Sequence, residues 1–228
     1  ARSQGVSCAD MSTLTAIGIR NAAFALLALF VAACGSDRVS LGEIYTDGYR
    51  KLESGDLRAA KVLAEDGLKK AKNIGNESWI WAFEVLDTEI LVGQRNITTD
   101  LLNRLDAGLS VKRPRDRVLV RALMARGLAH CLAPMNEKKS GTYRLAREST
   151  RAQTDLETAE HIADDLRNPR LAAEVMLRRG TCHALHGDNA AADEVFRKTM
   201  NAAQRQGFRL IEAKAAGNIG NLRIRSAE

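Results

Sequence analysis

The chain has 228 residues, of which 45% are hydrophobic and 27% charged, so it has the composition of a folded protein rather than of a disordered tail. Aromatic residues make up only 4%, which argues against a carbohydrate platform or a base-stacking surface, because both need exposed aromatic faces. The net charge is +6, but basic and acidic side chains are interleaved along the predicted helices. We therefore expect solvated helix faces and no nucleic-acid partner.

The N-terminal segment has the pattern of an export signal. The first methionine is Met11, so we expect residues 1–10 to lie upstream of the natural start. An apolar run over residues 22–33 follows the cation Arg20. This run is too short to span a bilayer and has the length of a signal-peptide core.

The end of that run, residues 31–34 with the sequence Val-Ala-Ala-Cys, resembles the bacterial lipobox, in which the cysteine is acylated and becomes the new N-terminus. The resemblance implies a signal peptide up to residue 33, a lipid on Cys34 that holds the protein at a membrane surface, and a short linker over residues 34–40. We expect an exported bacterial protein on the periplasmic side. The alternatives are cleavage after Ala33 without lipidation and an apolar helix that is retained.

Two stretches of the remaining chain share one pattern. Gly48, Gly55-Asp56, Ala59-Ala60 and Ala64 in the first correspond to Gly180, Gly187-Asp188, Ala191-Ala192 and Phe196 in the second. A pattern repeated at fixed spacing predicts stacked helical hairpins, because one hairpin cannot bury its apolar face alone. Such a stack offers an extended binding surface.

The first hairpin is predicted from residue 41 onward. Apolar residues at helical spacing predict a helix that ends at Gly55-Asp56, where the glycine takes a left-handed backbone conformation. A second amphipathic helix is predicted from Leu57 to Ala71. The pattern resembles the tetratricopeptide repeat family, in which small residues such as Gly48 and Ala60 let the paired helices approach closely. The resemblance implies an all-α fold, a right-handed α-solenoid of helical hairpins; the closing proline of the family is absent here.

Two less regular hairpins follow. The first comprises residues 78–92 and 97–109, although Leu86 stands where a small residue is expected. The next begins with a helix over residues 117–132, which is expected to end near Pro134.

A capping box predicts where the second helix of this third hairpin begins. Thr154 and Glu157 match the motif, so the helix is expected to start there. Residues 137–153 are then an insertion or an extended helical lead. A fourth hairpin over residues 171–206 and a helix over 210–224 complete about four repeats plus one helix. We expect that residues 41–228 form this array and that it is truncated; a terminal capping helix is the alternative.

Histidine and cysteine pairs lie at nearly equivalent places in two of the predicted helices, as His130-Cys131 and Cys182-His183. Zinc binding is disfavoured, because adjacent residues on a helix point about 100° apart and cannot both face one ion. The same geometry disfavours a thiol nucleophile with a neighbouring base. A Cys131–Cys182 disulfide is a further alternative in an exported protein. We expect plain packing, with no metal, no cofactor and no catalytic residue.

The concave face of a superhelical array is lined by the first helix of each hairpin. Matching the family pattern implies ten groove residues there: Tyr45, Tyr49, Phe83, Asp87, Arg121, Met124, Leu128, Glu174, Leu177 and Thr181. The alternative for several of them, notably Met124 and Leu177, is ordinary core between repeats. We expect this groove to bind a protein or peptide partner.

The sequence thus predicts a membrane-anchored binding scaffold. Its long repeats rich in Ala and Arg, such as residues 170–180, are similar to the N-terminal region of bacterial proteins that end in a caspase-like CHAT peptidase domain. This resemblance implies a regulatory role, with the enzyme beyond residue 228. One alternative is a complete scaffold lipoprotein similar to the repeat-containing member of the outer-membrane β-barrel assembly machinery or to pilus-assembly pilotins. Another is an independent enzyme built on Cys131 and His130.

Overall fold

The computed structural model describes residues 40–136 and 142–227, so the expected signal peptide, Cys34 and most of the linker lie outside the described residues. Within those residues every regular element is an α-helix, which confirms the all-α expectation. No described helix has both the length and the apolar character that a bilayer span needs. The helices are α2 (Leu41–Glu53), α3 (Leu57–Asn73), α4 (Glu77–Gly93), α5 (Thr99–Ser110), α6 (Arg117–Asn136), α7 (Thr142–Asp165), α8 (Pro169–Leu185), α9 (Asn189–Gln206) and α10 (Arg209–Ala227).

The repeated Gly-Asp pair forms the same turn in both places. Gly55 and Gly187 each have φ of +83°, a left-handed conformation that favours glycine. The following residue caps the next helix: Asp56 accepts the N–H of Ala59 at 3.1 Å, and Asp188 accepts the N–H of Ala191 at 3.1 Å. The predicted helix end at each Gly-Asp pair is confirmed.

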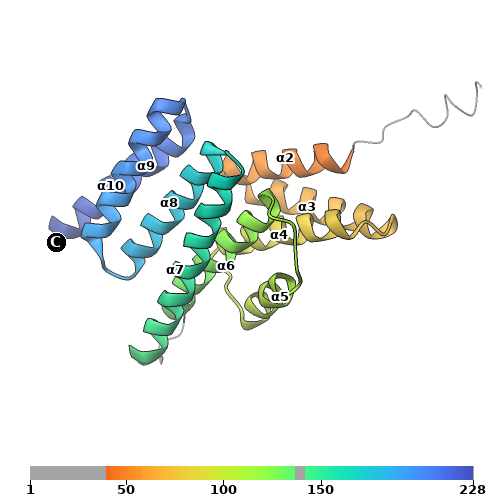
Figure 1. Ribbon diagram of the computed structural model, residues 1–228, viewed down its shortest axis with the longest axis horizontal. Helices are drawn as coiled ribbons and strands as arrows, with labels where there is room; N and C mark the ends of the chain where they lie inside the picture. Colours follow the sequence, from red (N-terminus) through yellow and green to blue (C-terminus); the bar gives the residue numbers. More distant parts are fainter. Residues whose placement is uncertain (1–39, 137–141, 228) are drawn as a thin grey trace, which may run out of the picture. The chain divides into compact units, whose positions relative to one another are not determined.

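The helices of residues 41–227 pack in two layers (Figure 1). The even-numbered helices α2, α4, α6, α8 and α10 each contact the next even-numbered one. The odd-numbered helices α3, α7 and α9 fill the spaces between successive even-numbered helices, while α5 packs on α6. Alternation of this kind lets each hairpin bury its apolar face against the next.

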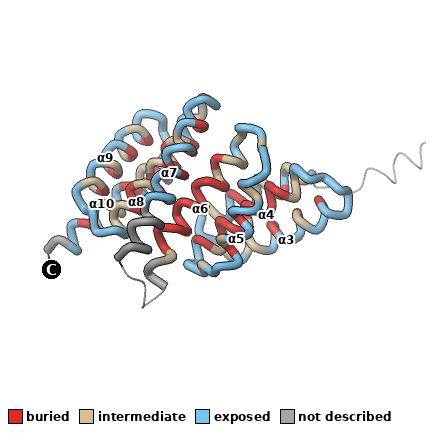
Figure 2. Tube along the Cα trace, turned by 60° about the horizontal axis from the view of Figure 1, so that its bottom comes forward, coloured by how far each residue is buried: buried red, intermediate tan, exposed pale blue. Residues whose placement is uncertain are grey.

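Burial follows this arrangement. Figure 2 shows buried residues along most of α6 and exposed residues along the outer sides of the odd-numbered helices. The largest fully buried side chains include Phe83 in α4 and Phe196 in α9. Small residues make room for such rings: a Cβ added at Gly180 would come within 2.6 Å of the Phe196 ring, and one added at Gly67 within 2.1 Å of the Phe83 ring.

Two expected boundaries differ from the structure. Helix α6 runs past Pro134 to Asn136. Helix α7 begins at Thr142 rather than at the predicted capping box, so the expected start at Thr154 is wrong and the extended helical lead is the better interpretation for residues 142–153. The Thr154 hydroxyl instead donates to the Thr150 carbonyl at 3.0 Å, as a mid-helix threonine does.

The cysteines are also a correction, because plain packing was expected for them. Cys131 of α6 and Cys182 of α8 form a disulfide, with their Cα atoms 5.5 Å apart and both residues buried. The physical reason is the even-numbered layer, which places equivalent positions of α6 and α8 side by side. The bond closes a sequence separation of 51 residues.

Replacing Gly180 by alanine tests the close packing. The new methyl group would clash with the buried Phe196 ring, so we expect Gly180→Ala to lower the free energy of unfolding by about 1–3 kcal/mol. Gly217→Ala is the matched control, since nothing lies within 4 Å of its added Cβ and alanine is favoured over glycine in a helix. Urea unfolding of both variants is the measurement. Equal effects of the two changes would contradict the proposed packing.

Removing the disulfide tests the second correction. We expect Cys131→Ser combined with Cys182→Ser to lower the free energy of unfolding by about 2–4 kcal/mol, because the unfolded chain loses the constraint of a long loop. Mass spectrometry of the unreduced, digested wild-type protein should recover the two peptides joined to each other. Recovery of both cysteines as alkylated free thiols without prior reduction would refute the bond.

Candidate binding site

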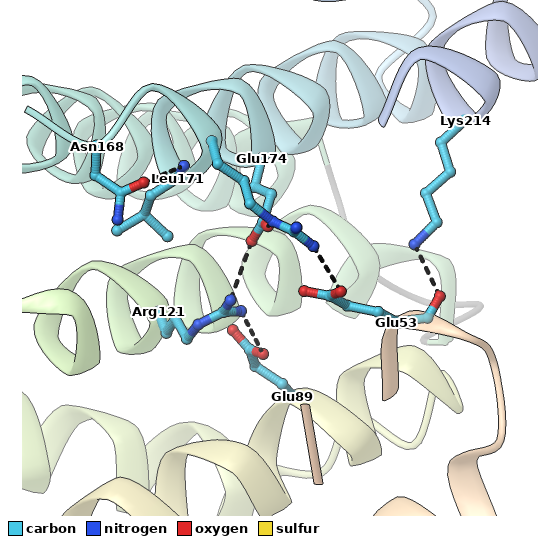
Figure 3. A network of polar contacts seen from close by, with 8 residues as sticks. Glu53, Glu89, Arg121, Asn168, Leu171, Glu174 and Lys214 are labelled. Carbon is cyan, nitrogen blue, oxygen red and sulfur yellow. Dashed lines mark hydrogen bonds and ion pairs between the residues drawn. The ribbon is translucent and has the colours of Figure 1, made fainter. Parts of the chain in front are cut away.

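A buried arginine connects four of the helices. Arg121 of α6 lies 3.4 Å from a carboxylate oxygen of Glu89 in α4 and 3.2 Å from one of Glu174 in α8 (Figure 3). Its guanidinium carbon also lies 3.9 Å from the centre of the Tyr49 ring of α2. The side chains of Arg121, Glu89 and Glu174 are only 16%, 8% and 17% exposed, so these charges interact with little screening by water.

The burial of this cluster shifts its ionisation. Burial raises the pKa of Glu89 above its ordinary value, although the neighbouring Arg121 acts in the opposite direction. Burial also opposes the charge of Arg121, but the neighbouring carboxylates of Glu89 and Glu174 raise its pKa overall. Arg121 is therefore a permanent cation at the centre of the cluster.

A second set of contacts joins the end of α2 to the C-terminal helices. Arg170 of α8 lies 2.7 Å from a carboxylate oxygen of Glu53 and 3.3 Å from one of Glu174. Lys214 of α10 donates to the Glu53 carbonyl at 3.4 Å (Figure 3). Helix α2 thus contacts α8 and α10 as well as its sequence neighbours, which means that the even-numbered layer bends back toward its start. Arg170 is about half exposed, so this second set is screened more strongly than the Arg121 cluster.

A pocket of about 710 Å³ lies beside these contacts, bounded by α2, α6 and α8 and by the first turn of α4. Half of its lining residues are charged. The lining comprises Tyr45, Thr46, Tyr49, Arg50, Glu53, Trp79, Asp116, Arg117, Val118, Arg121, Asn168, Arg170, Leu171 and Glu174. Aromatic side chains are scarce in this chain, yet one of its two tryptophans and two of its three tyrosines gather here.

The aromatic side chains form one cluster. The Tyr45 ring meets the rings of Tyr49, Trp79 and Phe83 edge-on, with centroids 4.7, 5.7 and 5.7 Å away. Burial raises the pKa of Tyr45 to about 12 and that of Tyr49 well above its ordinary value, so both phenols remain protonated donors at neutral pH. Among the residues that the structure describes, neither buried hydroxyl has a hydrogen-bond partner of ordinary geometry.

The ten predicted groove residues divide into three groups. Four of them line the pocket: Tyr45, Tyr49, Arg121 and Glu174. Four others are buried in the hydrophobic core: Phe83, Met124, Leu128 and Leu177. For these apolar side chains the structure supports the alternative interpretation, core between repeats, because they pack against neighbouring helices instead of facing a groove.

The last two predicted groove residues lie away from the pocket. Asp87 is largely buried and pairs with Lys61 of α3. The Thr181 hydroxyl donates to the Leu177 carbonyl within its own helix at 2.9 Å, and the residue lines a smaller cavity between α8, α9 and α10. The structure therefore does not bring all ten residues together.

Five residues of the site lie outside the set predicted from the sequence: Glu53, Trp79, Arg117 and Arg170 line the pocket, and Glu89 belongs to the Arg121 cluster. One signal was available for Glu89 and Arg121, since each is a charged residue inside a strongly apolar helix. Such residues are rarely buried without a partner of opposite charge. Nothing in the local sequence indicates that Glu53 meets Arg170, because that contact depends on how the layer bends.

The histidines and cysteines that the sequence offers for metal binding or catalysis do not line this pocket in the described part of the chain. No group of three or more histidine, cysteine or acidic residues that could hold a metal ion occurs within it. His130 is buried, and the His183 side chain lies 3.6 Å from a carboxylate oxygen of Asp188. A second cavity of about 540 Å³ is lined by polar residues, of which Arg126 is bound by Asp155 through two hydrogen bonds of 2.7 Å.

No protein-family model matches the chain, and no curated protein matches it.

Replacing Arg121 tests whether the cluster holds the helices together. We expect Arg121→Ala to lower the free energy of unfolding by about 3–5 kcal/mol, because Glu89 is left as a buried carboxylate without its partner. Arg170→Ala, which breaks the more exposed pair with Glu53, should cost less than about 1 kcal/mol. Thermal and urea unfolding of both variants measure the difference.

A second substitution separates loss of the charge pair from loss of packing. Adding Glu89→Gln to Arg121→Ala removes the unpaired carboxylate, so it should restore part of the lost stability. If Arg121→Ala and Arg170→Ala cost the same, or if Glu89→Gln restores nothing, the cluster is not the link that we infer.

Proposed function

We propose that the chain is a binding scaffold of the tetratricopeptide type, a right-handed α-solenoid that holds a segment of a protein partner in the pocket between α2, α6 and α8. One observation carries the proposal: the pocket gathers two tyrosines, one tryptophan and four arginines. These residue types dominate the energetic hot spots of protein interfaces. Aromatic and arginine side chains supply large contact areas together with directional hydrogen bonds.

The composition of the pocket favours a peptide over a small apolar molecule. Pockets for drug-sized ligands are mostly apolar with a few polar groups, whereas half of the residues lining this one are charged. An aromatic floor with a polar rim is the anatomy of a protein interface. The bend of the even-numbered layer supports the solenoid part of the proposal, because a superhelix of hairpins brings the first helices of separated repeats together on its inner face.

We further propose that the protein is exported and anchored through a lipid on Cys34. The Cys131–Cys182 disulfide supports export, since such bonds persist in oxidising compartments and are rare in the cytosol. The disulfide gives no support to the alternative of a Cys/His enzyme, because Cys131 then has no free thiol. A regulatory role for a CHAT-type peptidase stays a prediction from the sequence.

Selection of peptides from a random display library tests the proposed function. The bait is the full chain in mild detergent, and affinities of the enriched peptides are measured by fluorescence polarisation. Thr46 lines the pocket and is exposed, so Thr46→Trp should fill the pocket and weaken the enriched peptides at least tenfold.

The matched control places the same new side chain elsewhere. Val62 is 61% exposed on α3 and does not line the pocket, so Val62→Trp should leave peptide affinity unchanged. Enriched peptides that bind Thr46→Trp as well as wild type would show that this pocket is not the binding site.

A further inference from the structure

The acidic side chains of the pocket are already committed to partners within the fold. Glu53 pairs with Arg170, and Glu174 is shared between Arg170 and Arg121. Asp116 caps α6, where its carboxylate accepts the N–H of Leu119 at 2.9 Å. None of these carboxylates therefore needs a ligand to supply a hydrogen-bond donor.

The groups left over are donors. Arg117 lines the pocket, is exposed, and makes no ion pair or hydrogen bond with any residue that the structure describes. Asn168 uses its oxygen to accept the N–H of Leu171 at 3.1 Å, which leaves its amide N–H groups for a ligand. The Tyr45 and Tyr49 hydroxyls also have no acceptor of ordinary geometry in the described chain, but both oxygens are shielded from solvent and lie near each other, and that of Tyr49 lies near Glu89, so they are not counted as donors for a ligand.

Two helix ends add to the same preference. Helices α6 and α8 begin at Arg117 and Pro169, and residues of both first turns line the pocket. The N-terminus of a helix carries a partial positive charge that favours an anion, although the side chains of Asp116 and Asn168 already accept one N–H of each of these first turns. The uncommitted side-chain donors and the two helix dipoles thus both favour a negatively charged ligand.

We propose that this pocket recognises an acidic side chain, Asp or Glu, in the bound peptide, next to an apolar side chain that rests on the aromatic cluster of Tyr45, Tyr49 and Trp79. The inference rests on the proposed function, of which it names the ligand chemistry. The carboxylate of the ligand bonds to the exposed Arg117 and accepts from the amide N–H groups of Asn168. The apolar neighbour covers the rings and excludes water from these bonds.

The sequences of the selected peptides test this inference. We expect them to be enriched in Asp or Glu beside an aromatic or aliphatic residue. Replacing that acidic residue by Asn or Gln in the best peptide should weaken binding at least tenfold, and the affinity for the acidic peptide should fall as the NaCl concentration rises.

Substitution of the arginine gives the reciprocal test. Arg117→Gln should weaken the acidic peptide about tenfold and leave the neutral peptide unchanged, so that the two changes are not additive. Arg58→Gln is the matched control, because Arg58 is exposed on α3 outside the pocket, and it should change neither affinity. Circular dichroism of each variant verifies that the fold is kept.

The outcomes separate the two proposals. Peptides that Thr46→Trp weakens, but that bind equally well with Asn in place of Asp, overturn the acidic preference and leave the binding function standing. Equal effects of Arg117→Gln on the acidic and neutral peptides also overturn it. If no enriched peptide responds to Thr46→Trp, the proposed function and this inference both fail.

Discussion

The Arg121 guanidinium is the contact on which the arrangement of the even-numbered helices depends. It brings Glu89 of α4 and Glu174 of α8 to one cation and lies on the Tyr49 ring of α2. Burying each of these charges costs free energy of hydration. The attraction between Arg121 and its two carboxylates offsets that cost only when the cluster is fully assembled. The positions of the helices are therefore interdependent. If one helix moves away, a charged side chain on another is left buried without its partner.

The sequence predicts well what local backbone chemistry decides. Each Gly-Asp pair ends one helix and caps the next, because glycine reaches positive φ and the aspartate oxygen satisfies a free N–H group. The predicted helix start at the Thr154 capping box was wrong, because local sequence alone does not decide between a helix start and a helix interior there. The residues of the box are compatible with a helix start but equally with a helix interior, and α7 continues through them because Ala152 and Leu156 are buried against neighbouring helices.

The candidate binding site was only partly predictable, because its residues come from helices that are far apart in the sequence. The family pattern selected Tyr45, Tyr49, Arg121 and Glu174, which do line one pocket. It also selected apolar positions such as Met124, and the pattern alone does not distinguish an apolar groove wall from the core. The contact between Glu53 and Arg170 needs the bend of the layer, which no local sequence signal encodes, whereas the disulfide needs only that α6 and α8 are neighbours.

The fold and the proposed ligand site use different charges of the same helix. Arg117 and Arg121 are one turn apart on α6, yet Arg121 is buried between two carboxylates whereas Arg117 is exposed and unpaired in the described chain. Replacing Arg121 removes contacts to three other helices at once, so the stability of the fold limits which residues can stand at this position. Replacing Arg117 breaks no ion pair or hydrogen bond of the described chain, so under our proposal a change there alters ligand binding and not the fold. Ligand preference in such an array can therefore diverge at the rim while the buried cluster beneath it stays fixed.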